Sequence, residues 1–134
     1  MDNEILKAYV AGYFDGEGCI TTSGKSFRAT VSSTDYRELE FLKNSVGGVI
    51  NNQYLPKNEK WSMAWKWVMS PKKKLYNFLV DIEPYLITKK EQAREVINYF
   101  DEIGFAKADP NKFNTEKYEQ TKLALKKLKK HLPN

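Results

Sequence analysis

The sequence predicts an α+β fold in which helices alternate with two β-hairpins. Apolar residues recur at helical spacing in some segments and at every second position in others, and glycines or polar turn residues separate these segments. In chain order the segments give αββαββα, followed by extra C-terminal helices. Because the helix–hairpin unit occurs twice, we expect one antiparallel sheet with helices on one face and the other face exposed.

The length and composition indicate one domain. A chain of 134 residues with 41% hydrophobic residues can bury its own core without disulfides or structural metals. We expect a single domain over residues 1–134, with its core over about 4–103 and a C-terminal helical extension over 104–134. The single cysteine, Cys19, and the single histidine, His131, argue against disulfides, zinc sites and Ser-His-Asp triads within one chain.

Neither a signal peptide nor a membrane span is recognisable. The first residues are acidic, and no apolar run approaches the length needed to cross a bilayer. We therefore expect an intracellular protein that is not secreted and has no membrane partner. A bacterial or phage cytoplasm and an organelle are equally compatible with the sequence.

The positive charge is unevenly distributed along the chain. The net charge is +5, but residues 19–33 and 48–74 together carry +7, which leaves −2 for the rest. A phosphate backbone is the partner that such one-sided charge favours. A lysine-rich solvated surface is the alternative. The basic residues of the two stretches are Lys25, Arg28, Lys57, Lys60, Lys66, Lys72, Lys73 and Lys74.

The first predicted helix covers residues 3–15 and carries a stripe of small residues. Asn3 is a suitable N-cap, and the helix should end at Gly16 or Gly18. The stripe, Ala8, Gly12 and Gly16, repeats every fourth residue and would let another backbone approach closely. Because glycine costs about 1 kcal/mol inside a helix, Gly12 suggests that such close packing offsets the cost.

Two hairpins are predicted, at residues 19–22 with 27–32 and at 49–55 with 61–69. In the strand at 27–32, apolar residues alternate with Arg28, Thr30 and Ser32, so these three should lie on the exposed face. The apolar pattern of 49–55 leaves the face of Asn51 and Gln53 open. A curved, basic β-ribbon fits a DNA groove. The side chains predicted to contact DNA are Thr21, Lys25, Arg28, Thr30, Asn51, Gln53, Ser62 and Lys66.

The return strand of the second hairpin carries an aromatic stripe. Trp61, Met63, Trp65 and Trp67 share one face of the strand. The tryptophans could stack on bases, but an alternating stripe of this kind usually belongs to the core, which is the interpretation we favour. Further helices are predicted at residues 35–45, 71–82, 88–100 and 115–131.

The segment Val10-Ala-Gly-Tyr-Phe-Asp-Gly-Glu-Gly18 resembles the motif of the LAGLIDADG homing endonucleases position by position. The likeness continues through both hairpins to Pro84-Tyr-Leu-Ile-Thr-Lys-Lys-Glu-Gln92 and covers roughly residues 4–103. It implies an intron-encoded type of enzyme, a hydrolase that cuts both strands of a specific DNA site across the minor groove. Since the chain holds one motif, the resemblance implies a homodimer on a pseudo-palindromic duplex. The implied dimer interface is Ala8, Ala11, Gly12 and Gly16.

The resemblance also implies a metal site at the end of the motif. The motif's final acid, the family's metal ligand, is Glu17 here, where aspartate is more usual, and the Gly16 carbonyl lies beside it. Asp15 is a further candidate ligand, although its implied role is mainly to organise the turn. Such oxygen ligands suit Mg²⁺ or Mn²⁺, and Ca²⁺ should support binding without cleavage. The simpler interpretation of both acids is charge at a helix end.

Three other residues match positions that act around the scissile phosphate in this family. Lys89 corresponds to an active-site lysine, with Lys90 as the alternative one residue away and a solvated lysine as the simpler interpretation. Arg37 and Ser33 correspond to polar residues that order water there, although Ser33 replaces the usual glutamine.

Two other classes of function are compatible with the sequence. A protein of the same fold without nuclease activity, or with a double role, would be an RNA maturase that binds RNA or a DNA-binding regulator. A protein–protein adaptor is the third class, but it would leave the basic hairpins unexplained.

Overall fold

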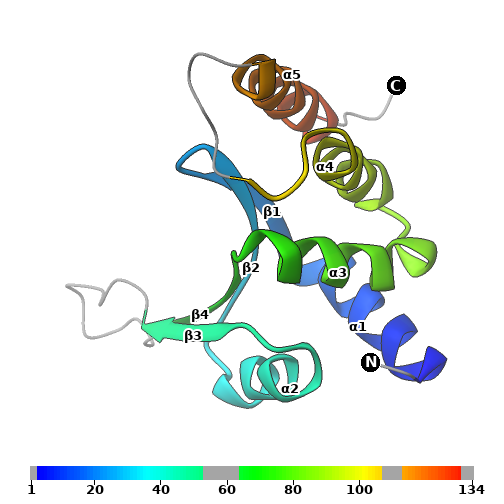
Figure 1. Ribbon diagram of the computed structural model, residues 1–134. Helices are drawn as coiled ribbons and strands as arrows, with labels where there is room; N and C mark the ends of the chain where they lie inside the picture. Colours follow the sequence, from blue (N-terminus) through cyan, green and yellow to red (C-terminus); the bar gives the residue numbers. More distant parts are fainter. Residues whose placement is uncertain (1–2, 53–63, 107–112, 131–134) are drawn as a thin grey trace.

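The computed structural model of the chain describes residues 3–52, 64–106 and 113–130. These residues form the predicted αββαββα order, followed by two further helices (Figure 1). The elements are α1 (Glu4–Glu17), β1 (Gly18–Ser23), β2 (Ser26–Ser33), α2 (Tyr36–Val46), β3 (Val49–Asn52), β4 (Trp65–Met69), α3 (Lys72–Ile82), the 3-10 turn η1 (Glu83–Tyr85), α4 (Lys90–Ile103) and α5 (Phe113–Leu128).

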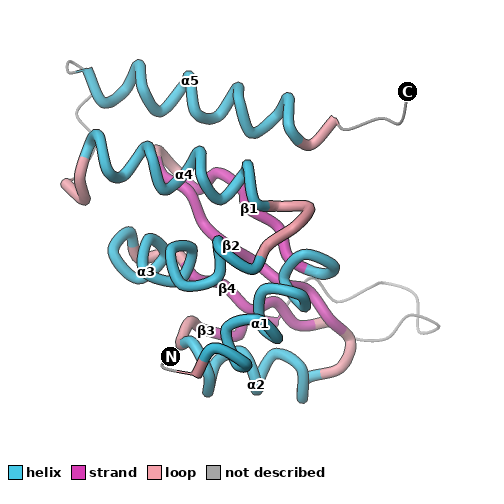
Figure 2. Tube along the Cα trace, turned by 90° about the vertical axis from the view of Figure 1, so that its right-hand side faces the viewer, coloured by secondary structure: helices cyan, strands magenta, loops and turns pink. Residues whose placement is uncertain are grey.

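The four strands form one antiparallel sheet in the order β1-β2-β4-β3, so β2 and β4 are central and β1 and β3 are edges. Ala29 pairs with Met69 and Val31 pairs with Trp67 across the central strands. Paired side chains share a face of the sheet, and these four are at most 1% exposed. This face is covered by helices, with α3 in front of the sheet in Figure 1 and to one side of it in Figure 2.

The tryptophan stripe belongs partly to this core, as predicted. Trp67 is fully buried, and its indole N–H donates to the Gly47 carbonyl at 2.8 Å. Trp65 is half-buried and packs edge-on against Tyr36, with ring centroids 5.4 Å apart. The predicted positions Trp61 and Met63 lie outside the described residues.

Helix α1 begins and ends for identifiable local reasons. Asn3 caps its start, because the Asn3 side-chain oxygen accepts the Ile5 N–H at 2.8 Å. At its C-terminal end, position 18 must be glycine, because a Cβ there would overlap the ring of Phe14. The φ of Gly18 is −85°, so the requirement for glycine here is steric and not conformational. Val10 and Phe14 lie on the buried side of the helix, which fixes α1 against the core.

Helix α5 joins the same core as the rest of the chain. Tyr118 and Leu125 are 5% and 3% exposed and belong to the central apolar cluster. The Tyr118 hydroxyl donates to the Gly24 carbonyl at 3.0 Å, at the tip of the first hairpin. Just after α5, the Lys129 ammonium donates to the Ile20 carbonyl on the edge strand β1. The C-terminal helix therefore supports the first hairpin from its tip to its edge.

None of the helices in the described parts of the chain is long and apolar enough to cross a bilayer.

Candidate active site at the end of the first helix

The Asp15 side chain is committed to contacts within the chain. Its carboxylate accepts the N–H groups of Ile87 at 2.7 Å and Lys89 at 3.0 Å, and the Thr88 hydroxyl at 3.1 Å. Helix α4 has no cap from its own N-cap side chain, so Asp15 supplies the cap from α1. These contacts occupy both carboxylate oxygens, and the suggestion that Asp15 is a metal ligand is therefore not favoured by its geometry.

Lys89 lies at the C-terminal end of α1, although it is 74 positions from its contact residue Asp15 in the sequence. Its ammonium donates to the Asp15 carbonyl, where the negative end of the helix dipole favours a cation. Lys89 is partly buried and precedes α4, whereas Lys90 is the first residue of that helix. Lys89 is thus the lysine of the pair whose ammonium reaches the motif helix. Of the three protons on a lysine ammonium, two remain for other acceptors.

Glu17 is the last residue of α1 and is exposed. It lines an open groove of about 360 Å³ together with Ser32, Ser33, Thr34 and Ala64. Gly16, whose carbonyl is the second predicted metal ligand, is exposed beside it. Within the described parts of the chain, no three His, Cys, Asp or Glu side chains cluster closely enough to hold a metal ion.

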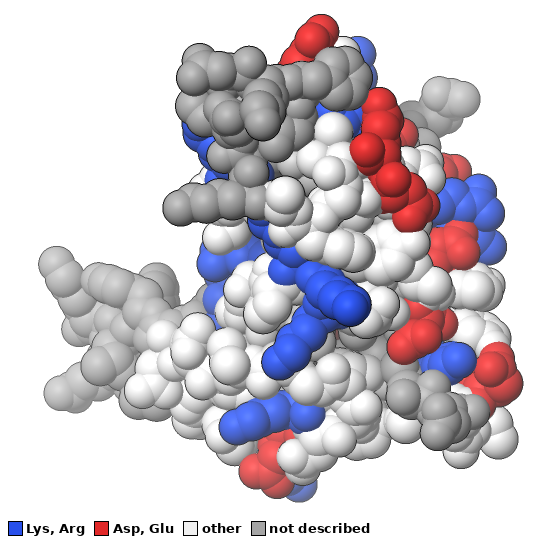
Figure 3. Space-filling model, in the orientation of Figure 1, with Lys and Arg blue, Asp and Glu red and all other residues white. Residues whose placement is uncertain are grey.

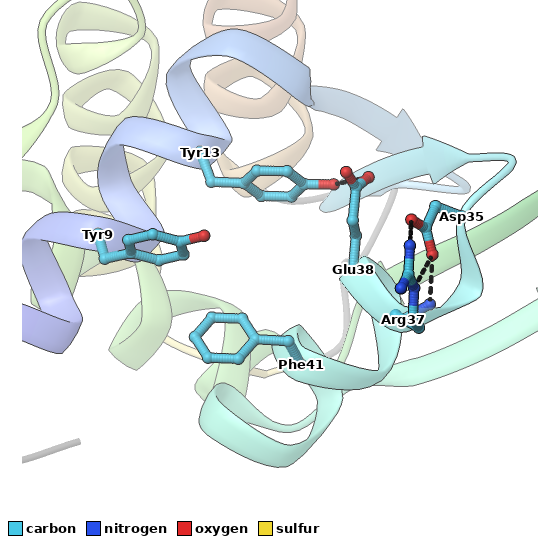
Figure 4. A pocket seen from close by; sticks show the side chains of 6 residues that line it. All are labelled: Tyr9, Tyr13, Asp35, Arg37, Glu38 and Phe41. Carbon is cyan, nitrogen blue, oxygen red and sulfur yellow. Dashed lines mark hydrogen bonds and ion pairs between the residues drawn. The ribbon is translucent and has the colours of Figure 1, made fainter.

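Ser33 belongs to a hydrogen-bond network that joins α1, β2 and α2. Its hydroxyl donates to Glu38 Oε2 at 2.8 Å, and its oxygen accepts the Asp35 N–H at 2.9 Å. The Tyr13 hydroxyl donates to the same Glu38 oxygen at 2.9 Å (Figure 4). Tyr13 and Glu38 were not among the residues predicted for the site. Tyr13 precedes Glu17 by one helical turn, which was an available signal, but no local pattern marks Glu38.

The ionisation of Tyr13 reflects this position. Burial raises the pKa of the Tyr13 hydroxyl above its ordinary value, and the hydrogen bond to Glu38 and the charges of Glu38 and Glu17 raise it further. Tyr13 therefore stays protonated and remains a hydrogen-bond donor.

Arg37 is paired within its own helix turn. Its guanidinium donates twice to Asp35, at 3.0 and 2.8 Å, and Asp35 also caps α2 by accepting the Arg37 N–H at 3.0 Å. The guanidinium hydrogen bond lowers the pKa of the Asp35 carboxyl, and the same pairing raises the pKa of Arg37. The Arg37 side chain is 90% exposed. It lines a pocket of about 440 Å³ with Tyr9, Tyr13, Asp35, Glu38 and Phe41, shown in Figure 4.

The small-residue stripe of α1 is open on the surface of the chain. Ala8, Gly12 and Gly16 are exposed, and a Cβ added at Gly12 or Gly16 would meet no atom within 4 Å. Ala11 does not belong to this surface: it is fully buried in the core, so its predicted place in the dimer interface was wrong. Three apolar side chains flank the open stripe with high exposure, namely Ile5 at 79%, Tyr9 at 63% and Ile87 at 84%.

The helix-free face of the sheet carries several of the predicted DNA contacts. Strand pairing places Ser32, Lys66 and Asn51 in one row across β2, β4 and β3. The face taken by Asn51, which the sequence left open, is therefore the one shared with Lys66. Thr21 pairs with Arg28 on the same face, and the Arg28 Nε–H donates to the Thr21 hydroxyl at 3.4 Å.

The other four predicted contacts have different outcomes. Thr30 is only 5% exposed between its neighbours Cys19 and Val68, so its side chain is not available to DNA and this prediction was wrong. Lys25 is exposed at the tip of the first hairpin. Gln53 and Ser62 lie outside the described residues, as do Lys57 and Lys60.

Part of the basic charge lies away from this face. Lys72, Lys73 and Lys74 form the first turn of α3 on the helical side of the molecule. In Figure 3, blue side chains cross the middle of that side. The described basic residues of 48–74 are therefore divided between the sheet, which carries Lys66, and α3, which carries Lys72, Lys73 and Lys74. The positive charge of the sheet is lower than the count along the sequence suggests.

Comparisons with known proteins agree on the type of domain. A family model described as the LAGLIDADG-like domain matches residues 4–99. The DNA endonuclease I-CreI of Chlamydomonas reinhardtii is 26% identical over 120 residues, which cover 83% of this chain and 72% of that protein. An archaeal intron-encoded homing endonuclease, I-Vdi141I complexed with DNA, has 17% sequence identity and a TM-score of 0.74, covering 98% of this chain and 88% of its own. The homing endonuclease I-CvuI in complex with its target has 19% identity and a TM-score of 0.59, covering 96% and 98%.

Proposed function

Because the chain belongs to the LAGLIDADG-like domain family, we propose that it is a homing endonuclease that cuts both strands of a specific DNA site as a homodimer with a divalent metal ion. The relative I-CreI is a DNA endonuclease, and the structural neighbours carry DNA. The observation that supports the proposal best is the position of Glu17, an exposed carboxylate at the end of a helix whose small-residue stripe is open to a second chain.

The homodimer is supported by the arrangement of side chains around α1. At about 100° per residue, Tyr9 and Tyr13 lie roughly 60–100° to one side of Gly12, and Asp15 lies about 60° to the other. If two chains meet along this stripe with their Glu17 residues side by side, the two-fold axis runs along the helices. The Tyr9 side of one chain then faces the Asp15 side of the other. This contact would bury the exposed Ile5, Tyr9 and Ile87.

The metal ion fits the donors at this end of α1. A carboxylate and a backbone carbonyl, from Glu17 and Gly16, are hard oxygen ligands that suit Mg²⁺ or Mn²⁺. The glutamate of the second chain would add the next carboxylate, and waters and DNA phosphate oxygens would complete the set. A metal ion bound there would activate water and stabilise the leaving 3′-oxygen.

The remaining side chains act on the DNA and on the water around it. Lys89 places a positive charge beside the acidic end of α1, where it can stabilise the negative charge that develops on the phosphate. Ser33 lines the Glu17 groove, so it is placed to hold a water there. The DNA would lie along the helix-free face of the sheet, with Lys66, Asn51 and Arg28 against it and the cuts made across the minor groove.

One experiment tests this proposal in full. The purified protein is incubated with a randomised duplex library and Mg²⁺, and the cleaved molecules are sequenced. We expect cleavage at a pseudo-palindromic site, because a symmetric dimer imposes its symmetry on the DNA. The same library with Ca²⁺ should give bound but uncut molecules. A library that stays intact in both Mg²⁺ and Mn²⁺ would refute the nuclease assignment.

A further inference from the structure

We infer that Glu38 is a positioning residue for the cleavage reaction. Glu38 accepts the proton of the Ser33 hydroxyl. Toward any group in the groove that contains Glu17, Ser33 can then act only as a hydrogen-bond acceptor. This inference rests on the proposed nuclease function and assigns a role to a side chain that lies outside the motif. Three contacts carry it: Ser33 to Glu38, Tyr13 to Glu38 and the Asp35 N–H to Ser33.

The bonding capacity of one hydroxyl group determines what Ser33 can do. A serine hydroxyl has one proton to donate and two lone pairs to accept with. The proton points to Glu38 Oε2 at 2.8 Å, and one lone pair receives the Asp35 N–H at 2.9 Å. One lone pair remains. Ser33 can therefore bind a further group in the groove only as an acceptor, and water is a small donor suited to that position.

This polarity matters for the attacking water. A water that donates one hydrogen to Ser33 keeps an oxygen lone pair free for another direction, so it can be aimed at a phosphorus atom. Without Glu38, the serine proton could rotate toward Glu17 or toward a DNA phosphate oxygen, and the water would lose its fixed acceptor. Glu38 thus acts through Ser33 and does not itself line the groove.

Tyr13 braces the arrangement from α1. Its hydroxyl donates to the same oxygen of Glu38, at 2.9 Å, which fixes the carboxylate between the motif helix and α2 (Figure 4). Because the pKa of Tyr13 is raised, its hydroxyl keeps its proton at neutral pH and remains a donor. Tyr13, Glu38 and Ser33 therefore form one hydrogen-bonded group across α1, α2 and β2, and Ser33 lines the groove that also contains Glu17.

A purely structural role for Glu38, as a tie between α1 and α2, is the alternative. Glutamine at position 38 can place its amide oxygen where Oε2 lies and accept both hydroxyl protons, so it preserves the tie and the polarity of Ser33 and removes only the negative charge. The two roles differ in whether the loss at position 38 depends on Ser33 being present, because a tie through Tyr13 does not need Ser33.

The test uses the full chain and a site obtained from the duplex library. Four variants are compared with the wild type: Glu38→Ala, Glu38→Gln, Ser33→Ala and the double variant with alanine at both positions. Glu40→Ala is the matched control, since Glu40 is an exposed glutamate on the same helix. The single-turnover cleavage rate with Mg²⁺, the Kd for the duplex with Ca²⁺ and the denaturation midpoint of the free protein are measured for each.

We expect Glu38→Ala to slow cleavage by about 10–100-fold, as is typical for residues that orient the groups around a metal site. The Kd in Ca²⁺ should not change, Glu38→Gln should restore most of the rate, and the double variant should be no slower than Ser33→Ala. The denaturation midpoints should be non-additive for Glu38 and Ser33, which reports their hydrogen bond without any metal. Tyr13→Phe provides a milder second variant if Glu38→Ala does not fold.

The inference is overturned if Glu38→Ala cleaves at the wild-type rate, if glutamine is as slow as alanine, or if the two alanine substitutions multiply in their effects on the rate. These outcomes leave the nuclease proposal intact, because the wild type still cuts its site. A wild type that cuts no member of the library refutes the nuclease proposal and the inference together.

Discussion

Asp15 and Lys89 contact each other twice. The Lys89 N–H donates to the Asp15 carboxylate at 3.0 Å, and the Lys89 ammonium donates to the Asp15 carbonyl. The first contact caps α4, and the second binds the C-terminal turn of α1. This reciprocal pair joins two helix ends that are far apart in the sequence and thereby fixes the candidate catalytic lysine beside the motif.

Replacing Asp15 by asparagine should destabilise the protein without removing a metal ligand. The new amide group would present a donor to the N–H of Ile87 or Lys89, so at least one capping contact is lost, at a cost of about 1–2 kcal/mol. Chemical denaturation measures this loss. Asp101→Asn is the matched control, because Asp101 accepts the Tyr76 hydroxyl and an amide oxygen can take over that contact. Equal stabilities of the two variants would contradict the capping role.

Replacing Glu17 by glutamine should abolish cleavage and leave binding in Ca²⁺ largely intact. The substitution keeps the shape of the side chain but removes the charge on which a divalent metal depends. The expected loss of rate exceeds about 100-fold, since even residues around the metal ligands cost 10–100-fold. Single-turnover cleavage and a binding titration separate the two effects. Undiminished cleavage by Glu17→Gln would exclude Glu17 as a metal ligand.

Replacing Gly12 by leucine should yield a stable chain that does not dimerise. A Cβ added at Gly12 has no atom of its own chain within 4 Å. Replacing glycine inside a helix also improves the helix propensity by about 1 kcal/mol. The leucine would hold a second helix away from the stripe. Sedimentation at micromolar concentration measures the assembly state, with Gln120→Leu on the exposed side of α5 as the control. A Gly12→Leu protein that remains dimeric would place the interface elsewhere.

The Asp35–Arg37 pair should make a contribution to stability that is lost in acid. Because Arg37 lowers the pKa of Asp35 in the folded chain below its ordinary value of 3.8, the contribution is complete above that value. It disappears as the pH falls through the lower pKa of the folded state. The difference in unfolding free energy between the wild type and Asp35→Asn should therefore shrink in acid below about pH 4. A difference that is constant throughout the acid range would contradict this linkage.

Replacing Lys66 by alanine should weaken DNA binding in a salt-dependent manner. Lys66 lies in the row with Ser32 and Asn51 on the helix-free face of the sheet. Loss of one phosphate contact makes the negative slope of log K against log salt less steep by about 0.9. Lys73→Ala is the control, because Lys73 lies in α3 on the other side of the molecule. If the two variants behave alike, the DNA does not lie along the sheet.

The elements of the fold were predictable because their signals are local. The Asn3 cap, the spacing of Val10 and Phe14, and the alternation of Phe27, Ala29 and Val31 all lie within one segment each. The structure confirms the α+β class and the order of the elements on this basis.

The errors arose where a position depends on distant neighbours. Ala11 has the size expected of an interface residue, but it lies on the buried side of α1. Thr30 is on the predicted face, yet it is only 5% exposed between its strand neighbours Cys19 and Val68. The roles of Asp15 and Glu38 depend on contacts with residues in other elements, and a single sequence contains no local signal for such contacts.

Gly18 shows that a residue within a motif can be required by the size of a neighbouring side chain and not by the chemistry of the site. The aromatic ring of Phe14 occupies the space where any other residue at position 18 would place its Cβ. Positions 14 and 18 should therefore vary together among relatives, with alanine appearing at 18 only where a smaller side chain stands at 14. A search pattern that treats this glycine as part of the chemistry would reject such relatives, although their acidic residue one position earlier could be fully competent.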